Sequence, residues 1–333
     1  MFKINPHAPL CVLLAALILL AALCSAGCGL FSPEEEHRAS PTYFPAGQQI
    51  QSEEPAFLGA SDETPDASQT FREATVYYRS DEGYIVPVKK LIPWEEGIAR
   101  ACLGYMVSTP ANDLAASELG LNTVLPAGVS FTLAIDNGEA KLDLIGLAPL
   151  AAAADEAAML EAVINTLTEF ASVSTVTVTV EGRGGALANG TELPVRSPRV
   201  ALNVEQQELA ASSGAAPSTL WFPNMSGAIS VPVTRYFSSE PSLYKKVAAL
   251  IEGPVTEGLR CCFPNGTLLL GATLENGVVT VNLSEDFKQV ADTYGLYTLA
   301  CRTLALTLAE DFTFDKLVTQ VNGTDYMPEN IED

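Results

Sequence analysis

The sequence contains one short pattern twice, and this repeat constrains the fold more than any other feature. An alternating apolar run, an Asn-Gly pair and a second alternating run occupy 129–144 and again 268–283. Asn-Gly between two alternating runs is a strong signal for a β-hairpin, because a type I′ turn needs positive φ at both central residues. We therefore predict two copies of one small domain, each built around this hairpin.

The repeat continues on both sides of the hairpins. Val86-Pro87-Val88 recurs as Val231-Pro232-Val233, 145 residues later, and apolar residues at helical spacing follow each segment. At the same offset we align the first stripes as Ile98, Cys102, Tyr105 and Met106 with Leu243, Val247, Leu250 and Ile251. The stripes after the hairpins are Leu160, Val163, Ile164 and Leu167, and then Cys301, Leu304, Ala305 and Leu308. The first copy is about six residues longer between its first helix and its hairpin, and we place the extra residues in 111–122.

Further apolar runs predict a strand at each end of both copies. The opening strands are 75–78 and 219–222, and the closing strands are 176–181 and 316–321. Each copy therefore has the order β-β-α-β-β-α-β. Because alternation leaves one sheet face in water, the helices are expected on the other face. The predicted fold class is α+β, with two tandem copies of a two-layer domain. The expected equivalent pairs are Val86 with Val231, Phe131 with Leu270, and Leu142 with Val281.

The N-terminus has the features of a lipoprotein signal peptide. An unbroken apolar run covers 10–23, which is short for a membrane-spanning helix but suits a signal peptide. The small residues Ser25, Ala26 and Gly27 then precede Cys28, as in a bacterial lipobox, although Ser25 stands where Leu is usual. We predict cleavage before Cys28 and lipidation of that residue, with palmitate among the acyl chains. An ordinary signal peptide and an uncleaved anchor remain the alternatives.

Composition then divides the chain. Residues 28–73 hold the lipidated Cys and a flexible acidic linker, because runs of Glu and scattered Pro cannot bury enough apolar surface to fold. The predicted parts are the signal peptide 1–27, this linker 28–73, domain 1 at 74–200, a linker 201–217, domain 2 at 218–327 and a tail 328–333. The formal net charge of −22 disfavours nucleic-acid binding, because phosphates repel an acidic chain.

Histidine and cysteine usage speak against catalysis and metal binding in the two domains. His7 and His37 both precede the first copy, which excludes His-based triads and His metal ligands from the domains. Cys102 and Cys301 lie on apolar helical stripes and are expected in the core. Cys261-Cys262 lacks the spacing of a metal or redox motif, and a disulfide from either residue to Cys301 is left open.

Two motifs resemble catalytic ones and are interpreted as structural. Ser242 and Lys245 form a Ser-x-x-Lys motif at a helix start, but the partner motifs of penicillin-interacting enzymes are missing from the sequence. Glu285-Asp286 follows a strand, where carboxylates are typical of a turn or helix cap. We therefore predict no catalytic residue, no metal site and no cofactor.

The repeated motifs resemble the GerM family of sporulation and spore-germination domains. The resemblance rests on the Val-Pro-Val strands, the turns 125–128 and 263–266, the Asn-Gly hairpins and the helix end Asn-Thr-Leu-Thr-Glu-Phe at 165–170. It covers 74–181 and 218–324, and the second copy keeps only part of the helix end, at 306–312. The resemblance implies a non-catalytic envelope role in sporulation or germination. Similarity to ring-building modules implies protein–protein assembly.

The sequence thus favours a non-enzymatic lipoprotein on the outer face of the cell membrane, acting as an assembly module. Its partners are expected to be envelope or sporulation-complex proteins, with the membrane reached through the lipid. The alternative is a ligand-binding lipoprotein that captures a small molecule or a peptidoglycan fragment. The candidate interaction residues are Tyr77, Tyr78, Trp221 and Phe222, because they lie on opening strands expected at sheet edges.

Overall fold

The structure is a computed structural model that describes residues 71–93, 97–205, 210 and 214–328. All of these residues belong to one compact unit, Tyr43–Asp333. The predicted signal peptide, Cys28 and the acidic linker lie outside the described residues. Within the described part of the chain, every helix is too short or too polar to cross a membrane.

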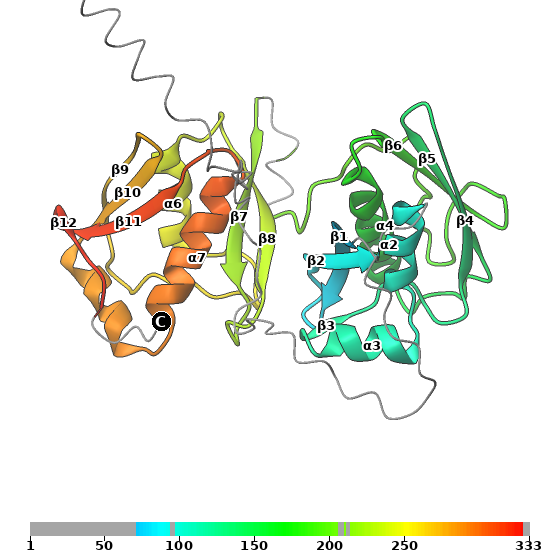
Figure 1. Cartoon of the computed structure of the whole chain (residues 1–333), viewed down its shortest axis with the longest axis horizontal. Coiled ribbons are helices and arrows are strands. Elements are labelled where there is room, and N and C mark those ends of the chain that lie inside the picture. The colour runs from blue at the N-terminus through cyan, green and yellow to red at the C-terminus, as the bar shows by residue number, and fades with distance from the viewer. Residues whose placement is uncertain (1–70, 94–96, 206–209, 211–213, 329–333) are drawn as a thin grey trace, which may run out of the picture. The chain divides into compact units, whose positions relative to one another are not determined.

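Each repeat shows the predicted order of elements (Figure 1). The first repeat contains β1 (Phe71–Ser80), β2 (Ile85–Pro93), α2 (Ile98–Met106), α3 (Pro110–Ser117), β3 (Leu121–Asn122), β4 (Ser130–Asp136), β5 (Glu139–Ile145), α4 (Ala153–Thr168) and β6 (Thr175–Val180). The second contains β7 (Ala216–Pro223), β8 (Ser230–Phe237), α6 (Leu243–Glu252), β9 (Leu269–Glu275), β10 (Val278–Leu283), the 3-10 helix η1 (Glu285–Asp292), α7 (Leu296–Ala309), β11 (Lys316–Val321) and β12 (Thr324–Asp325). The additions α3 and β3 fall in the stretch where the sequence predicted extra residues.

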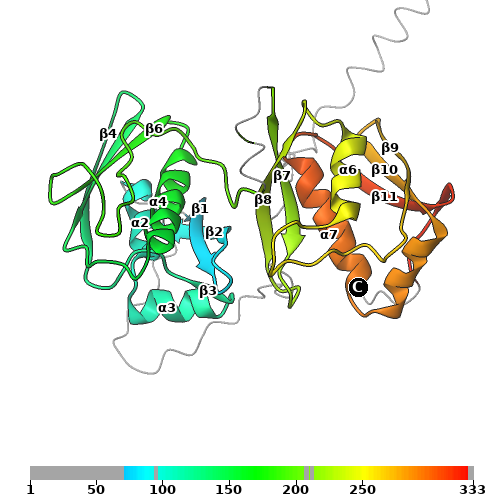
Figure 2. The same ribbon diagram turned by 180° about the vertical axis from the view of Figure 1, so that it is seen from behind.

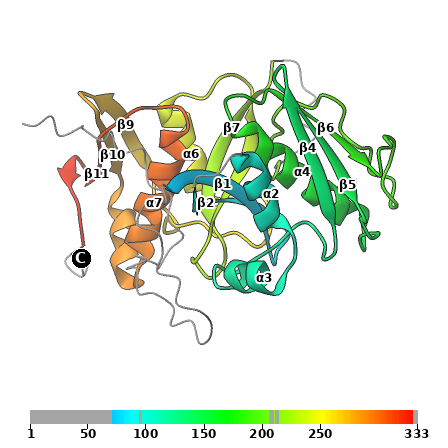
Figure 3. The ribbon, with the colours of Figure 1, turned by 45° about the vertical axis from the view of Figure 1, so that its right-hand side comes forward.

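The helices of each repeat have strands on both sides, which refines the two-layer expectation. In the first repeat β1 and β2 form one sheet with β3, in the order β2-β1-β3, and β4-β5-β6 form another. In the second repeat the sheets are β7-β8 and β12-β11-β10-β9. Figures 2 and 3 show the helices of each repeat between its opening two-stranded ribbon and its second sheet. Helix α4 is accordingly buried on several sides and contacts both β1 and β6. The α+β class is confirmed.

The repeated Asn-Gly pairs form the predicted hairpin turns. Asn137 and Gly138 have φ of 51° and 79°, and Asn276 and Gly277 have φ of 52° and 75°. These values match the positive φ that a type I′ turn requires at both positions. Each hairpin is antiparallel, and its second strand pairs in parallel with the closing strand, which the chain reaches through α4 or α7. A helical crossover is the ordinary way to join parallel strands.

Two of the three predicted equivalent pairs are confirmed. Val86 faces Tyr78 in the first ribbon, and Val231 faces Phe222 in the second. All four residues are at most 2 % exposed, so the ribbons present the same face to each core.

Leu142 with Val281 is the second confirmed pair. They face Leu133 and Ala272 across their hairpins, and both lie in the core. The two hairpins therefore share one register at this point.

The third pair, Phe131 with Leu270, is wrong because of a β-bulge. Phe131 faces Leu144 in the first hairpin, whereas the strand register shifts at Asn282/Leu283 in the second. An extra residue in one strand changes which side chains face the core. Leu269 therefore takes the place equivalent to Phe131, and Leu270 is 49 % exposed.

The first helices align one residue away from the predicted match. The Arg100 Nη2 donates to the carbonyl oxygen of Phe131, and the Tyr244 hydroxyl donates to that of Leu269, so Arg100 and Tyr244 are equivalent. Cys102 then corresponds to Lys246 and not to Val247. The core position of Cys102 is confirmed, since it is fully buried, and its counterpart in the second repeat is a fully buried lysine.

Candidate functional site

The four candidate aromatic side chains are buried and do not form an exposed surface. Tyr77, Tyr78, Trp221 and Phe222 are between 1 % and 4 % exposed. The opening strands do lie at sheet edges among the described residues. Over 75–78 strand β1 pairs only with β2, because β3 joins it only at Arg79 and Ser80, and β7 pairs only with β8. The side chains fill the space between each ribbon and its helices. A role for these four residues in binding stays a prediction.

Tyr77 of the first repeat is held by two residues at the end of α4. Its backbone N–H donates to Thr166 Oγ1 at 3.2 Å. Its hydroxyl donates to Glu169 Oε1 at 2.7 Å. Burial and the neighbouring Glu169 carboxylate raise the pKa of Tyr77 far above its usual value, so the phenol stays protonated.

Trp221 makes the same two contacts in the second repeat. Its backbone N–H donates to Thr307 Oγ1 at 2.8 Å, and its indole Nε1 donates to Glu310 Oε1 at 2.9 Å. Burial raises the pKa of the Glu310 carboxyl, while the indole hydrogen bond opposes this shift. In each repeat, therefore, an aromatic residue of the opening strand is hydrogen-bonded to a Thr and a Glu at the C-terminal end of α4 or α7.

The proline of each Val-Pro-Val segment explains this arrangement. Pro87 lies opposite Tyr77, and Pro232 lies opposite Trp221. Because the N–H groups of Tyr77 and Trp221 point to the helices, these pairs form no ladder hydrogen bond between them. A proline, which has no N–H, is tolerated at such an outward-facing position of an edge strand.

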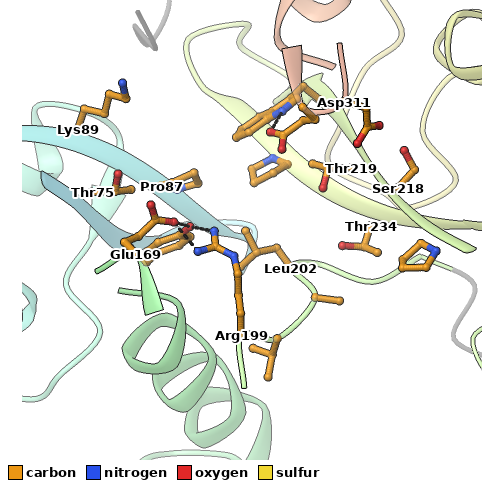
Figure 4. A pocket seen from close by; sticks show the side chains of 17 residues that line it. Thr75, Pro87, Lys89, Glu169, Arg199, Leu202, Ser218, Thr219, Thr234 and Asp311 are labelled. Atoms are coloured by element: carbon orange, nitrogen blue, oxygen red, sulfur yellow. Dashed lines mark hydrogen bonds and ion pairs between the residues drawn. The ribbon is translucent and has the colours of Figure 1, made fainter. Parts of the chain in front are cut away.

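The aromatic–glutamate pairs of the two repeats line a common cleft, which we call the junction cleft. It has a volume of about 770 Å³, and its lining includes Thr75 and Tyr77 from β1 and Thr219 and Trp221 from β7 (Figure 4). Thr75 and Tyr77 are equivalent to Thr219 and Trp221 in the two ribbons, so both repeats contribute the same face to this cleft. Segment 199–202, between the repeats, lines it as well.

The charged groups of the junction cleft are arranged in ion pairs. These pairs are Lys89 with Glu73 at 2.8 Å, Arg199 with Glu169 at 2.6 Å, and Lys246 with Asp311. Arg199 also donates to the Tyr77 hydroxyl. Asp311 is 45 % exposed at its side chain, whereas its partner Lys246 is fully buried. The remaining carboxylate, Glu310, accepts from Trp221.

One buried polar side-chain atom of the cleft lining lacks a hydrogen-bond partner within the described residues. Ser218 on β7 is 7 % exposed, and its Oγ makes no hydrogen bond. A buried hydroxyl without a partner carries a desolvation penalty. Figure 4 shows its side chain on the side of β7 where Asp311 lies.

Asn203 joins the two ribbons beside the cleft. Its side-chain Nδ2 donates to the carbonyl oxygens of Ile85 at 2.8 Å and Pro232 at 2.7 Å, and its Oδ1 accepts from the Ile85 N–H at 2.9 Å. Its backbone N–H donates to Glu161 Oε1. One amide therefore satisfies backbone groups at the outer edges of β2 and β8.

A buried ion pair anchors the same segment to the second repeat. Arg235 on β8 donates through Nε to Glu205 Oε2 at 2.8 Å, and both side chains are less than 10 % exposed. Glu205 Oε1 accepts from the Val255 N–H at 2.8 Å, and Arg235 also donates to the carbonyl of Gly253 at 2.8 Å. The charges are thus hydrogen-bonded on several sides, as buried charges must be.

The hairpins of the two repeats each begin with an outer strand of the second sheet. Strand β4 pairs only with β5, and β9 pairs only with β10, among the described residues. Beside β9, Leu268 is 62 % exposed and Leu270 is 49 % exposed. We call this stretch, residues 268–275, the β9 edge.

The remaining motifs are placed as follows. Cys102, Cys261, Cys262 and Cys301 are all free thiols. Ser242 caps α6 by accepting from the Lys245 N–H, which agrees with the structural interpretation of the Ser-x-x-Lys motif. Within the described residues, His, Cys, Asp and Glu form no cluster of three or more suited to a metal ion.

The sequence motifs at 165–170 and 306–312 contain a shared Thr and a shared Glu, to which sequence reasoning assigned no role. Thr166 and Glu169 recur as Thr307 and Glu310 at the constant offset of 141 residues. These are polar residues at matched places at the ends of α4 and α7. The recurrence of the same two polar residues at one offset could have indicated a shared contact in both repeats. Asn203 carried no such signal, because it lies between the repeats and has no counterpart.

Fold and site together define a protein of two tandem α+β repeats with a cleft lined by equivalent faces. A family model described as Germane, sporulation and spore germination, matches residues 75–185 and 219–326. The chain belongs to this family, which assigns it a role in sporulation or spore germination.

One curated protein and the solved structure of its domains are similar to this chain. The spore germination protein GerM of Bacillus subtilis (strain 168) is 24% identical over 343 residues, which cover 93% of this chain and 90% of the relative. The solved tandem GerMN domains of the sporulation protein GerM from Bacillus subtilis match with a TM-score of 0.61 and 22% identity. That match covers 79% of this chain and 96% of the solved one, and it shows the shared fold.

Proposed function

We propose that this chain is a non-enzymatic assembly module, held at the outer face of the cell membrane through lipid on Cys28 and serving sporulation or germination by protein contacts. The observation that supports this most directly is the pair of equivalent outer strands β4 and β9, each of which pairs on one side only among the described residues. An unpaired strand edge presents N–H and C=O groups that another strand can pair with.

The β9 edge is the stronger of the two candidates. Leu268 and Leu270 are exposed there, and the bulge at Asn282/Leu283 turns this part of the strand away from the core. The corresponding part of β4 begins with Ser130, which is polar and exposed. An apolar surface beside a free edge combines main-chain pairing with burial of side chains.

The charges of the junction cleft support a non-catalytic role. Its Lys and Arg residues are bound in ion pairs with neighbouring carboxylates, and Glu310 accepts from an indole. A general acid or base must be free to reach a substrate proton. These groups instead hold side chains of the protein in place.

A substitution at the β9 edge tests the proposal. We expect Leu270→Arg to impair spore formation or germination in the native host, because it places a charge where an apolar contact is proposed. Leu114→Arg is the matched control, since Leu114 is 62 % exposed on α3, which belongs to the other repeat. Both proteins should fold, as judged by circular dichroism. Normal sporulation and germination with Leu270→Arg would refute the role of this edge.

The anchor is tested separately. Cys28→Ser should leave the protein unlipidated and should release it from membranes or block its processing. Membrane retention together with normal processing in that variant would contradict the lipid anchor, whatever the outcome at the β9 edge.

A further inference from the structure

We propose that the junction cleft is a binding site for a neutral carbohydrate that bears hydroxyl and amide groups, such as a short amino-sugar glycan. This function is separate from protein assembly through the β9 edge, and neither proposal depends on the other.

The first observation is the buried hydroxyl of Ser218. The residue is more than nine-tenths buried, lines the cleft, and its Oγ has no hydrogen-bond partner among the described residues. Such a group is costly in a protein on its own, because it has lost its water without gaining a bond. A ligand with hydroxyl or amide groups would supply the missing partner.

The second observation comes from comparing the two repeats. Ser218 occupies the position at which the first repeat has Ala74. Asp311 occupies the position at which it has Phe170. The first repeat thus folds with an apolar residue at the place of Ser218, so the hydroxyl there is not needed for folding. Asp311 differs, because it pairs with the buried Lys246, where the first repeat has Cys102. The second repeat alone places this hydroxyl and this carboxylate beside the cleft.

The charge balance selects a neutral ligand. Three carboxylates in or beside the lining are paired with cations. Glu73 pairs with Lys89, Glu169 with Arg199, and Asp311 with Lys246. The fourth, Glu310, is already bonded to Trp221. A phosphate would meet these carboxylates without an unpaired cation to hold it, and a polyamine would meet the three cations.

Hydrogen-bonding groups remain for a neutral polar molecule. Thr75, Thr219 and Thr234 contribute hydroxyls to the lining, and Asp311 contributes a carboxylate that is 45 % exposed. Pro87 and Pro232 add apolar surface suited to the C–H faces of a sugar ring. The volume of about 770 Å³ lies in the range of sites that hold small ligands.

The strand edges argue against an added peptide strand in the cleft. The N–H groups of Tyr77 and Trp221, which face away from the partner strands, already donate to Thr166 and Thr307. A peptide that extended either ribbon would have to break these bonds. A ligand that bonds through side chains and leaves these N–H groups in place fits better.

The test is a binding titration of the full-length chain, purified in detergent, with two neutral trisaccharides, one of glucose and one of N-acetylglucosamine. Calorimetry should detect binding of the N-acetylglucosamine trimer, and comparison with the glucose trimer shows whether the amide groups matter. We expect Ser218→Ala to weaken binding by about three- to tenfold, the effect of losing one hydrogen bond. It should fold normally, because the first repeat has Ala74 at this place.

Thr132→Ala is the control, because Thr132 is exposed on β4, away from the cleft lining. Its affinity should equal that of the unchanged protein. Thr219→Trp is a second test variant, in which a large side chain from the lining fills the cleft and should abolish binding. The proposal is overturned if neither sugar binds at millimolar concentration or if Ser218→Ala binds as tightly as the unchanged protein. Saturable binding of a lysine-containing peptide without binding of either sugar would also overturn it.

Discussion

The side-chain amide of Asn203 donates to the carbonyl oxygen of Pro232 at 2.7 Å, although the two residues belong to different parts of the repeat architecture. The same amide exchanges two hydrogen bonds with the backbone of Ile85. Pro232 is the central residue of the Val-Pro-Val segment of one repeat, and Ile85 begins β2, the corresponding strand of the other. A single linker residue therefore forms hydrogen bonds with backbone groups at the outer edges of two equivalent strands. Those groups are then not available to pair with another strand.

Replacing Asn203 should destabilise the protein. The backbone of Asn203 has φ of 47°, so Asn203→Gly removes the amide without adding backbone strain. Ile85 and Pro232 then lose their partners, and we expect the free energy of unfolding to fall by about 1–3 kcal/mol. Urea denaturation followed by circular dichroism measures this change.

Asn322→Gly is the control for that experiment. Asn322 has nearly the same φ, 49°, but its side chain makes one exposed hydrogen bond, to Glu285. We expect its effect to be within about 0.5 kcal/mol of zero. Equal effects of the two substitutions would show that the amide of Asn203 contributes nothing specific.

The Glu161 carboxyl should make stability depend on pH. Burial raises the pKa of Glu161 to about 7, while the N–H of Asn203 opposes the shift. A raised pKa means that the fold disfavours the charged form. This contribution is complete below the ordinary pKa of about 4.5 and is lost as the pH rises through 7. Glu161→Gln should therefore raise the free energy of unfolding by about 1–3 kcal/mol at pH 8 and change it little at pH 4.5.

Urea titrations at the two pH values decide this point, with Glu118→Gln as the control at an exposed position on the same repeat. A Glu161→Gln effect that is the same at pH 4.5 and pH 8 would contradict the raised pKa. The acceptor role toward Asn203 is preserved in this variant, because a glutamine retains one side-chain oxygen.

The repeated patterns show how much of the structure could be predicted from sequence. The hairpins at Asn137 and Asn276 were predictable because their turn chemistry is local. The burial of Cys102 followed from helical spacing alone. These features depend on residues close together in the chain, where periodicity and turn preferences carry the information.

The β9 register could not be predicted in this way. Whether Leu269 or Leu270 faces the core depends on a bulge opposite Leu283, and the alternating sequence fits either choice. The site was hidden for a similar reason. Ile85 and Asn203 are 118 positions apart, and nothing in either local sequence indicates their contact.

Removing one partner of the ion pair between Arg235 and Glu205 should lower the stability of the protein strongly. Arg235→Met leaves the Glu205 carboxylate buried without its cation, and we expect a loss of about 3–5 kcal/mol. The double variant Arg235→Met/Glu205→Gln should recover part of this loss, because it removes the uncompensated charge. A double-mutant cycle from denaturation curves measures the coupling.

The first repeat provides the matched control. Lys90 lies over the ring of Tyr78 at 5.6 Å, as Arg235 lies over Phe222 at the same distance, but Lys90 forms no ion pair with any residue that the structure describes. Burial lowers the pKa of Lys90. We expect Lys90→Met to change stability by no more than about 1 kcal/mol. An equally large loss with Lys90→Met would indicate that the arginine's role is packing and not pairing.

The threonine hydroxyls at the ends of α4 and α7 should matter equally in both repeats. Thr307→Val keeps the shape of the side chain but removes the acceptor of the Trp221 N–H, and Thr166→Val does the same for Tyr77. Both threonines are fully buried, so each substitution leaves a backbone donor without a partner and should cost about 1–3 kcal/mol. Thr168→Val is the control, because the Thr168 hydroxyl bonds only carbonyls of its own helix and should change stability by less than about 1 kcal/mol. Chemical denaturation of the three variants compares them directly. A cost at Thr307 without one at Thr166 would show that the two repeats share the geometry of this contact but not its energetic importance.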